Sequence, residues 1–270
     1  SNDVVVGHES QQYVDFEVYA KRVFFANGIH HHYSNKKFAA DFDQAWFLSA
    51  LQTLGVTLSE EAQRAIFDPE FDAKKVNRAD GVDLLLASAV NFYAPDITQA
   101  EAEAFYAAKV DADPDRPVSH GLNSRLSRDE NGKIYEEVFS ARGRYANSIK
   151  EIIGHLEKAK DVAENTDQAA ALKLLIEYYE TGDLTKWDDY NIAWVKTTGG
   201  DVDYINGFVE VYNDPMGYRG SYETVVQVKD FDASARMAVV ADNVQWFEDN
   251  STIMDDHKKE SVVGVSYKIV

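Results

Sequence analysis

Apolar side chains recur every three or four residues in several stretches of the first 110 positions, a spacing that places them on one face of a helix. The pattern predicts helices at 11–27, 42–54, 82–92 and 98–110, and a short helix that begins after Ser59. Gly28 and Gly55 stand where the first two helices should end. Thr98 and Glu101 have the spacing of a capping box, in which the hydroxyl and the carboxylate each satisfy a free backbone N–H.

The pattern changes after the helix-breaking segment 113–117. Asn131-Gly132 separates two alternating stretches, 120–127 and 133–139, and this dipeptide favours a tight hairpin turn with two positive φ angles. Helical spacing returns at 145–162, at 167–179 and at 185–195. Thr166 is the expected cap of the middle helix, and Gly182 is its expected end.

A second hairpin is predicted near the end of the chain. Its strands are expected at 203–212 and 221–228, with a turn at Asn213-Asp214-Pro215-Met216-Gly217. A helix at 233–247 and a strand at 261–270 should follow. The expected fold class is therefore α+β, predominantly helical, with a small antiparallel β-sheet or barrel formed mainly by the second half.

Three regions are expected from these elements. Residues 1–112 should form an N-terminal helical region, and 113–230 a mixed region of helices and hairpins in a substrate-binding lobe. Residues 231–270 would then be a helix and a strand that lead into a further lobe. The unterminated apolar strand at the end and the scar-like Ser1-Asn2 at the start indicate a cut polypeptide.

Charge excludes some partners. The chain has 27 Lys and Arg against 46 Asp and Glu, a formal net charge of -19, which repels phosphate backbones and anionic lipid surfaces. Because of this charge we expect no nucleic acid as a partner. We also expect no membrane partner, because no apolar run reaches the roughly 18 to 20 residues that cross a bilayer. The absence of cysteine excludes disulfides and thiolate metal sites. It leaves the compartment open: a cytoplasmic location is favoured, and an exported or periplasmic one applies if a leader was removed.

Histidines suggest a metal at first sight. In His30-His31-His32, consecutive side chains point in different directions, so at most two converge on one ion. The pattern favours a polar loop in which one or two imidazoles bond to backbone. His8-Glu9 resembles the start of an HExxH zinc helix, but Gln12 stands where the second histidine belongs. No metal ligands are predicted in this chain.

The second hairpin carries the most suggestive polar residues. On an extended strand, Phe208, Glu210 and Tyr212 would share one face, which places a carboxylate beside a phenol. Glu223 on the return strand would add negative potential suited to a cation such as a peptide's amino terminus. The alternative is a solvated hairpin face with ordinary Glu and Tyr.

The segment from Gly207 to Glu223 resembles the signature GF(I/V)ExYxDPxGxRGxxE of the dipeptidyl peptidase III family (peptidase family M49). Ten positions fit: Gly207, Phe208, Glu210, Tyr212, Asp214, Pro215, Gly217, Arg219, Gly220 and Glu223. The segment 190–195 and, more loosely, the residues Asn27-Gly28, Tyr33-Ser34 and Lys36-Lys37-Phe38 are also similar to the family.

The resemblance implies a two-lobed zinc metallopeptidase that removes dipeptides from the amino ends of short peptides. Glu210, with help from Glu223, would bind the substrate ammonium, and the catalytic Tyr212 would donate its hydroxyl to the developing oxyanion. The family's HExxGH zinc motif does not occur in these 270 residues. Zinc is thus expected in the full-length protein and not in this chain, with the rest of the polypeptide, the zinc lobe, as partner.

Two other functions stay open from the sequence. One is a non-catalytic module that binds peptide amino termini with the same hairpin. The other is a structural or interaction domain in which the signature match is coincidence.

Overall fold

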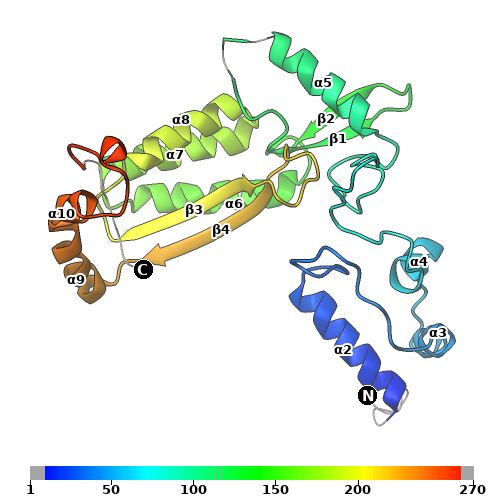
Figure 1. Ribbon diagram of the computed structural model, residues 1–270. Coiled ribbons are helices and arrows are strands. Elements are labelled where there is room, and N and C mark those ends of the chain that lie inside the picture. The colour runs from blue at the N-terminus through cyan, green and yellow to red at the C-terminus, as the bar shows by residue number, and fades with distance from the viewer. Residues whose placement is uncertain (1–9, 113, 116, 263–270) are drawn as a thin grey trace. The chain divides into compact units, whose positions relative to one another are not determined.

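A computed structural model of the protein (Figure 1) describes residues 10–112, 114–115 and 117–262. The chain divides into two compact units, one formed by Ser1–Glu137 with Glu210–Gly220 and the other by Val138–Val209 with Ser221–Val270. His8-Glu9 and positions 263–270 of the expected last strand lie outside the described residues. Every helix within the described part is too short or too polar to span a bilayer.

Three helices open the first unit: α2 (Gln11–Phe25), α3 (Gln44–Thr53) and α4 (Glu60–Phe67). Each begins after a residue whose side-chain oxygen accepts a backbone N–H three positions later; these caps are Ser10, Asp43 and Ser59. Asn27 takes a positive φ of 55°, and the Gly28 N–H returns to the Val23 carbonyl at 2.9 Å. The predicted helix end at Gly55 is confirmed, whereas the first helix ends at Phe25, before the predicted Asn27, and Asn27 takes the left-handed conformation there.

The apolar faces of these helices meet in one small core. Phe42 is its centre: its ring lies 5.2 to 5.6 Å from those of Phe16, Tyr19 and Phe47. Aromatic rings at such distances, in edge or tilted arrangements, bury large areas and fix relative orientation. The first helices are thus held by aromatic packing around a residue that precedes α3.

Helix α5 (Gln99–Ala112) begins at the predicted capping box. The Glu101 carboxylate accepts the Thr98 N–H at 3.0 Å and the Thr98 hydroxyl at 2.9 Å. It also accepts from the Arg128 guanidinium at 2.9 Å, which ties the helix start to strand β1 (Ser124–Arg128). The backbone bond from Thr98, followed by the Arg128 bond, lowers the pKa of Glu101 to about 2.

The helix predicted at 82–92 is wrong. The chain forms a single turn there, in which the Asp83 carboxylate accepts the N–H groups of Leu85 and Leu86 at 3.0 Å. Beyond that turn the backbone bonds to a distant segment, because the Ala89 N–H donates to the Lys74 carbonyl at 2.9 Å. Long-range hydrogen bonds therefore replace the helical ones that the apolar spacing favoured.

The first predicted hairpin is confirmed as β1 paired with β2 (Ile134–Val138), but its turn differs. Gly132 has a φ of 81°, whereas Asn131 does not take a positive φ. The Asp129 carboxylate accepts the N–H groups of Asn131 and Lys133 at 2.9 and 2.8 Å. This side chain stabilises a longer loop in place of the tight two-residue turn.

The second unit is built on three helices, α6 (Ala146–Asp161), α7 (Thr166–Thr181) and α8 (Leu184–Val195). Figure 1 shows them side by side along the hairpin of β3 (Val202–Glu210) and β4 (Ser221–Val228). Helix α7 supplies most of the core, with seven buried residues. Strand β3 packs on this layer so closely that a Cβ at Gly207 would lie 2.3 Å from the Trp187 ring.

The start of the β3–β4 hairpin is held by Glu164. Its carboxylate accepts the N–H groups of Asp201, at 2.9 and 3.0 Å, and of Val202, at 3.0 Å. Gly200 has a φ of 92°, and a Cβ there would lie 2.6 Å from the Glu164 carboxylate. The glycine is required because the carboxylate must approach the backbone this closely.

Two details of the second unit differ from expectation. Helix α7 begins one residue earlier than predicted, because Asn165 and not Thr166 is the cap, with its Oδ1 accepting the Gln168 N–H at 2.9 Å. The helix expected at 233–247 is divided at Asn243 into α9 (Phe231–Asp242) and α10 (Val244–Asp249), before the short helix η1 (Asp255–His257). The end at Gly182, with a φ of 73°, is confirmed.

The fold class is α+β, as predicted. The described residues are mainly helical and contain two small antiparallel sheets, β1–β2 and β3–β4, each of two strands.

Candidate functional site

The loop that follows β3 is organised by Asp214, whose side chain is fully buried. Its carboxylate accepts the backbone N–H groups of Met216, Tyr218 and Arg219 at 3.1, 2.9 and 2.8 Å. A buried carboxylate is tolerated only when its oxygens are bonded in this way. Asp214 therefore fixes the path of the backbone between positions 214 and 219.

Two side chains from elsewhere in the first unit hold this loop. The Tyr93 hydroxyl bonds to the Asp214 carboxylate at 2.8 Å, and the Arg78 guanidinium donates to the Asp214 carbonyl at 2.9 Å. Burial, together with the neighbouring carboxylate, raises the pKa of Tyr93 far above its ordinary value. The phenol stays protonated and serves as a donor.

Arg219 is also fully buried, and it lies between aromatic faces. Its guanidinium carbon is 4.4 Å from the Tyr93 ring centroid and 5.0 Å from that of Tyr106. Nη2 donates to the Tyr106 hydroxyl, whereas Nε and Nη1 have no hydrogen-bond partner in the part of the chain that the structure describes. The two rings thus supply much of the stabilisation of this charge.

The contact with Tyr106 continues to a carboxylate on the first hairpin. The Tyr106 hydroxyl donates to Glu136 at 2.7 Å, and Ser124 donates to the same oxygen at 2.8 Å. Burial by itself raises the pKa of Glu136, but bonds from Lys109 and Tyr106 outweigh it and lower that pKa. An ionised Glu136 therefore anchors the aromatic residues that enclose Arg219.

Gly121 makes room for this arrangement. Its φ is 89°, and a Cβ there would lie 2.7 Å from Arg219 Nη1 and 3.1 Å from the Tyr106 hydroxyl. The neighbouring Leu122 carbonyl accepts the Gly220 N–H at 2.8 Å. The backbone at 121–122 therefore packs directly against the loop at 214–220.

The predicted site residues have a different character from Asp214 and Arg219. Glu210 is the last residue of β3 and is exposed, and Tyr212 is 52% exposed in the loop that follows. Phe208 is buried against Phe139, with ring centroids 5.1 Å apart. The expected strand continues only to Glu210, so strand alternation does not relate Tyr212 to Phe208. Both polar groups are accessible to a ligand.

Glu223 lies on β4 in the second unit and is half-buried. Its neighbours Tyr222 and Thr224 each accept from the Asn206 amide, at 3.3 and 3.2 Å. The Asn206 amide oxygen in turn accepts from the Tyr179 hydroxyl of α7 at 2.6 Å. This network fixes the strand on both sides of Glu223 to the helical layer.

The histidine-rich loop behaves as a polar loop. His30 bonds through Nε2 to the Asp72 carbonyl at 2.7 Å, and burial lowers its pKa. His31 Nδ1 accepts the N–H groups of Tyr33 and Ser34 at 3.3 and 3.2 Å. These bonds confirm the expectation that one or two of the imidazoles bond to backbone. No group of three or more His, Cys, Asp or Glu within the described residues is arranged to hold a metal.

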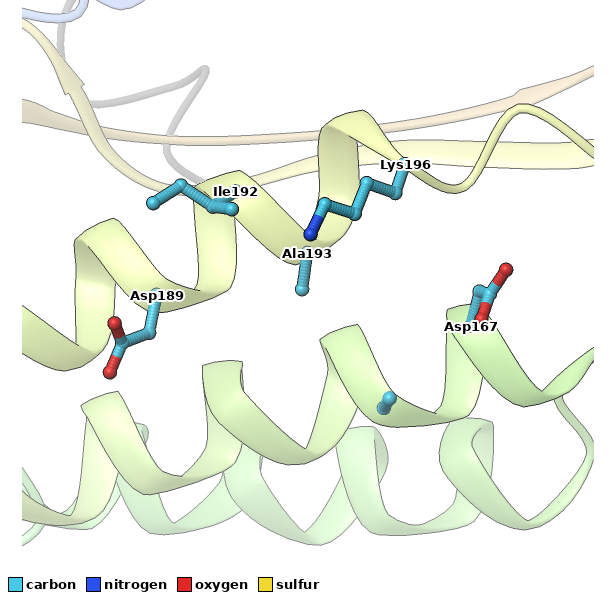
Figure 2. Close-up of a pocket in the computed structure, with 6 residues that line it drawn as sticks. Asp167, Asp189, Ile192, Ala193 and Lys196 are labelled. Carbon is cyan, nitrogen blue, oxygen red and sulfur yellow. The ribbon is translucent and has the colours of Figure 1, made fainter.

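A separate pocket of about 300 Å³ lies between α7 and α8 (Figure 2). Its polar residues are Asp167, Asp189 and Lys196, and Figure 2 shows Asp189 projecting from α8 toward α7. Its polar side chains carry opposite charges, as is common where solvated helix faces meet. No residue of the signature lines it.

Sequence reasoning missed Tyr93, Tyr106 and Glu136, which enclose the signature's buried residues. Tyr93 stands 121 positions before Asp214, and Tyr106 and Glu136 stand 113 and 83 positions before Arg219. Their spacing in the sequence does not connect them with Asp214 and Arg219. The need for aromatic partners follows from the burial of Arg219, which the structure reveals.

Comparison with known proteins places this chain in a family of peptidases. A family model described as peptidase family M49 matches residues 74–248. The chain belongs to peptidase family M49, which confirms the resemblance noted from its sequence.

Relatives and solved structures agree with this assignment. Dipeptidyl peptidase 3 of Rattus norvegicus is 35% identical over 95 residues, which are 35% of this chain and 13% of that protein. Dipeptidyl peptidase 3 of Dictyostelium discoideum is 25% identical over 175 residues, which are 58% of this chain and 25% of that protein. The structure of DPP III from Caldithrix abyssi is similar in fold, with a TM-score of 0.51 at 18% identity. That match covers 96% of this chain but 45% of the other, so the chain spans less than half the length of the proteins that it resembles.

Proposed function

We propose that this chain is the substrate-binding portion of a zinc-dependent dipeptidyl peptidase that releases dipeptides from the amino termini of peptides. One observation carries the proposal beyond family membership. Within the signature, Asp214 and Arg219 are buried and bonded to the protein, whereas Glu210 and Tyr212 are exposed. The exposed pair has no comparable part in holding the loop, and it is free to contact a ligand.

In this proposal Glu210 binds the ammonium group of the peptide, with Glu223 contributing negative potential. A carboxylate and an ammonium form a charge-assisted contact that fixes where the peptide ends. A fixed end places the second peptide bond in a constant position, which is the requirement for release of dipeptides.

Tyr212 is proposed as the catalytic residue of this chain. Its phenolic O–H would donate to the oxygen of the scissile carbonyl as negative charge develops there. A donor aimed at developing charge stabilises the transition state more than the ground state. The buried loop around Asp214 and Arg219 would give this donor a constant position before substrate binds.

The metal is proposed to come from another part of the polypeptide. The HExxGH motif does not occur in these 270 residues, and the described side chains offer no group of three ligands. The residues that the structure describes therefore do not fit a zinc site. We propose that the chain is inactive alone, and turnover of a dipeptidyl-arylamide by the purified chain with added zinc would refute this.

Calorimetry with a short peptide and its N-acetylated form tests the binding role. We expect the free peptide to bind and the acetylated form to bind at least tenfold more weakly, because acetylation removes the cation. Glu210→Gln should abolish this difference. Glu17→Gln is the matched control, since Glu17 is exposed on α2 and contacts Lys21 at 3.3 Å.

Two results would separate the alternatives. If both peptides bind equally and Glu210→Gln changes neither affinity, the chain is a structural or interaction domain. A preference for the free amino terminus that is not matched by turnover in a polypeptide with the zinc lobe would identify a non-catalytic peptide-binding module.

A further inference from the structure

A second candidate site lies in the first unit, beside α4 and away from the signature in sequence. It is a pocket of about 450 Å³. Apolar side chains that include Phe38, Ile66 and Phe67 line it, together with Lys36, Lys37 and Lys74. The combination of an apolar lining with three lysines is unexpected in a chain that has 46 acidic and 27 basic residues.

Lys37 has a structural part in this pocket. Its Nζ donates to the carbonyl groups of Asp68 and Phe71, which follow the end of α4, and the Asp68 carbonyl also accepts the Phe71 N–H at 3.3 Å. Burial lowers the pKa of Lys37. This lysine is therefore used by the fold.

Lys36 and Lys74 are different, because they stand opposite each other in an antiparallel bridge. Residues opposed in this way direct their side chains to the same side, and like charges placed so are destabilising. Neither Nζ has an ion-pair or hydrogen-bond partner among the residues that the structure describes. The nearby Asp68 carboxylate is engaged by Arg64 at 3.4 Å and by the Glu70 N–H at 3.0 Å.

Two unpaired ammonium groups at an apolar pocket fit an anion that carries an apolar group. A carboxylate accepts from both lysines and removes their mutual repulsion, while the attached group fills the apolar part. We propose that this pocket binds the carboxyl terminus of a peptide, with the α-carboxylate at Lys36 and Lys74 and the last, apolar side chain against Phe38, Ile66 and Phe67. The choice of a peptide among carboxylates rests on the proposed function.

The test uses the N-acetylated dipeptide acetyl-Phe-Leu, which has no ammonium group for Glu210. Its affinity for the whole chain is measured by calorimetry and compared with that of the C-terminal amide. We expect the free acid to bind at least tenfold more tightly, equivalent to about 1.4 kcal/mol. The double variant Lys36→Met/Lys74→Met, which keeps the apolar stems, should lose this difference.

The control is Lys21→Met/Lys173→Met, which removes the same charge from two exposed helical lysines. Its affinity for the acid should equal that of the wild type, and Glu210→Gln should leave the affinity unchanged as well. Failure of this site is thereby distinguished from failure of the Glu210 site.

Several outcomes would overturn the proposal. They are no measurable binding of the acid, equal binding of acid and amide, or equal weakening by the two double variants. Octanoate binding more tightly than acetyl-Phe-Leu would also overturn it, because the occupant would then be an aliphatic acid and not a peptide.

Discussion

The Tyr93 hydroxyl lies within 3.0 Å of both carboxylate oxygens of Asp214, although 121 positions separate the two residues. This contact joins the segment before α5 to the loop after β3. Asp214, the acidic residue of the DPxG sequence, therefore has a structural role: its buried carboxylate bonds to one phenol and three backbone N–H groups.

Asp214→Asn should destabilise the chain by about 3 kcal/mol, because an amide group offers one acceptor oxygen and presents N–H groups to other donors. Urea unfolding followed by circular dichroism measures the change. Asp41→Asn is the control, since Asp41 is exposed and 4.0 Å from Arg22, and it should change stability by less than about 0.5 kcal/mol. Equal effects of the two variants would contradict the role given to Asp214.

Gly121→Ala should be more damaging than Gly132→Ala. Both glycines have a positive φ, of 89° and 81°, so both variants incur similar backbone strain. Only at Gly121 does the new Cβ meet Arg219 and Tyr106, whereas nothing lies within 4 Å of a Cβ at Gly132.

We expect Gly132→Ala to cost about 1 kcal/mol and Gly121→Ala about 1 to 3 kcal/mol more, the added cost of overpacking a filled interior. Thermal unfolding of the two variants measures the difference. If the two transitions coincide, the packing of Arg219 against Gly121 is not a significant constraint.

The Glu101 cap should make stability depend on pH. The pKa of Glu101 is about 2 in the folded chain and about 4.3 in an unfolded one. Because the folded pKa is the lower one, the stabilisation is present above about pH 4.3 and is lost as pH falls toward 2.

Glu101→Gln keeps a capping-box side chain but cannot titrate, so the fall in urea midpoint between pH 5 and pH 2.5 should be smaller in this variant. Glu103→Gln, two residues further along α5, serves as the control and should retain the wild-type fall. If the urea midpoint of Glu101→Gln falls with pH as much as that of the wild type, the Glu101 cap does not contribute to the acid sensitivity of the chain.

Tyr212→Phe tests catalysis in a polypeptide that joins this chain to a lobe with the HExxGH motif. We expect kcat to fall by about 10²- to 10³-fold with KM nearly unchanged, because the lost bond forms only as charge develops. Tyr33→Phe, at a side chain that is 85% exposed, should leave both constants unchanged. A rise in KM at constant kcat would assign Tyr212 to substrate binding instead.

Much of the fold was predictable where the signal is local. Ser59, the Thr98 and Glu101 pair, and Gly182 each act on a backbone within four residues of themselves, and the structure confirms all three. The failures arise where a distant group competes. At 82–92 the Lys74 carbonyl replaces a helical partner, and at Asn131-Gly132 the Asp129 carboxylate selects a longer loop.

The signature identified Glu210, Tyr212 and Glu223, and their roles remain predictions. The division of the signature into buried and exposed members was not predictable, because it depends on Tyr93 and Tyr106. Those residues meet Asp214 and Arg219 only after the chain has folded across more than 100 positions.

The bonds that the N–H groups of Asp201 and Val202 donate to the Glu164 carboxylate have a kinetic consequence. The amides of Asp201 and Val202 point at a carboxylate, and the Lys229 N–H returns to the Asp201 carbonyl at 2.8 Å. The end of the hairpin opposite its loop, where two strands ordinarily fray, is thus stabilised by these hydrogen bonds. Deuterium should enter at the Asp201 and Val202 amides only when they part from the Glu164 carboxylate, so their exchange reports the opening of the contact between the hairpin and the loop before α7.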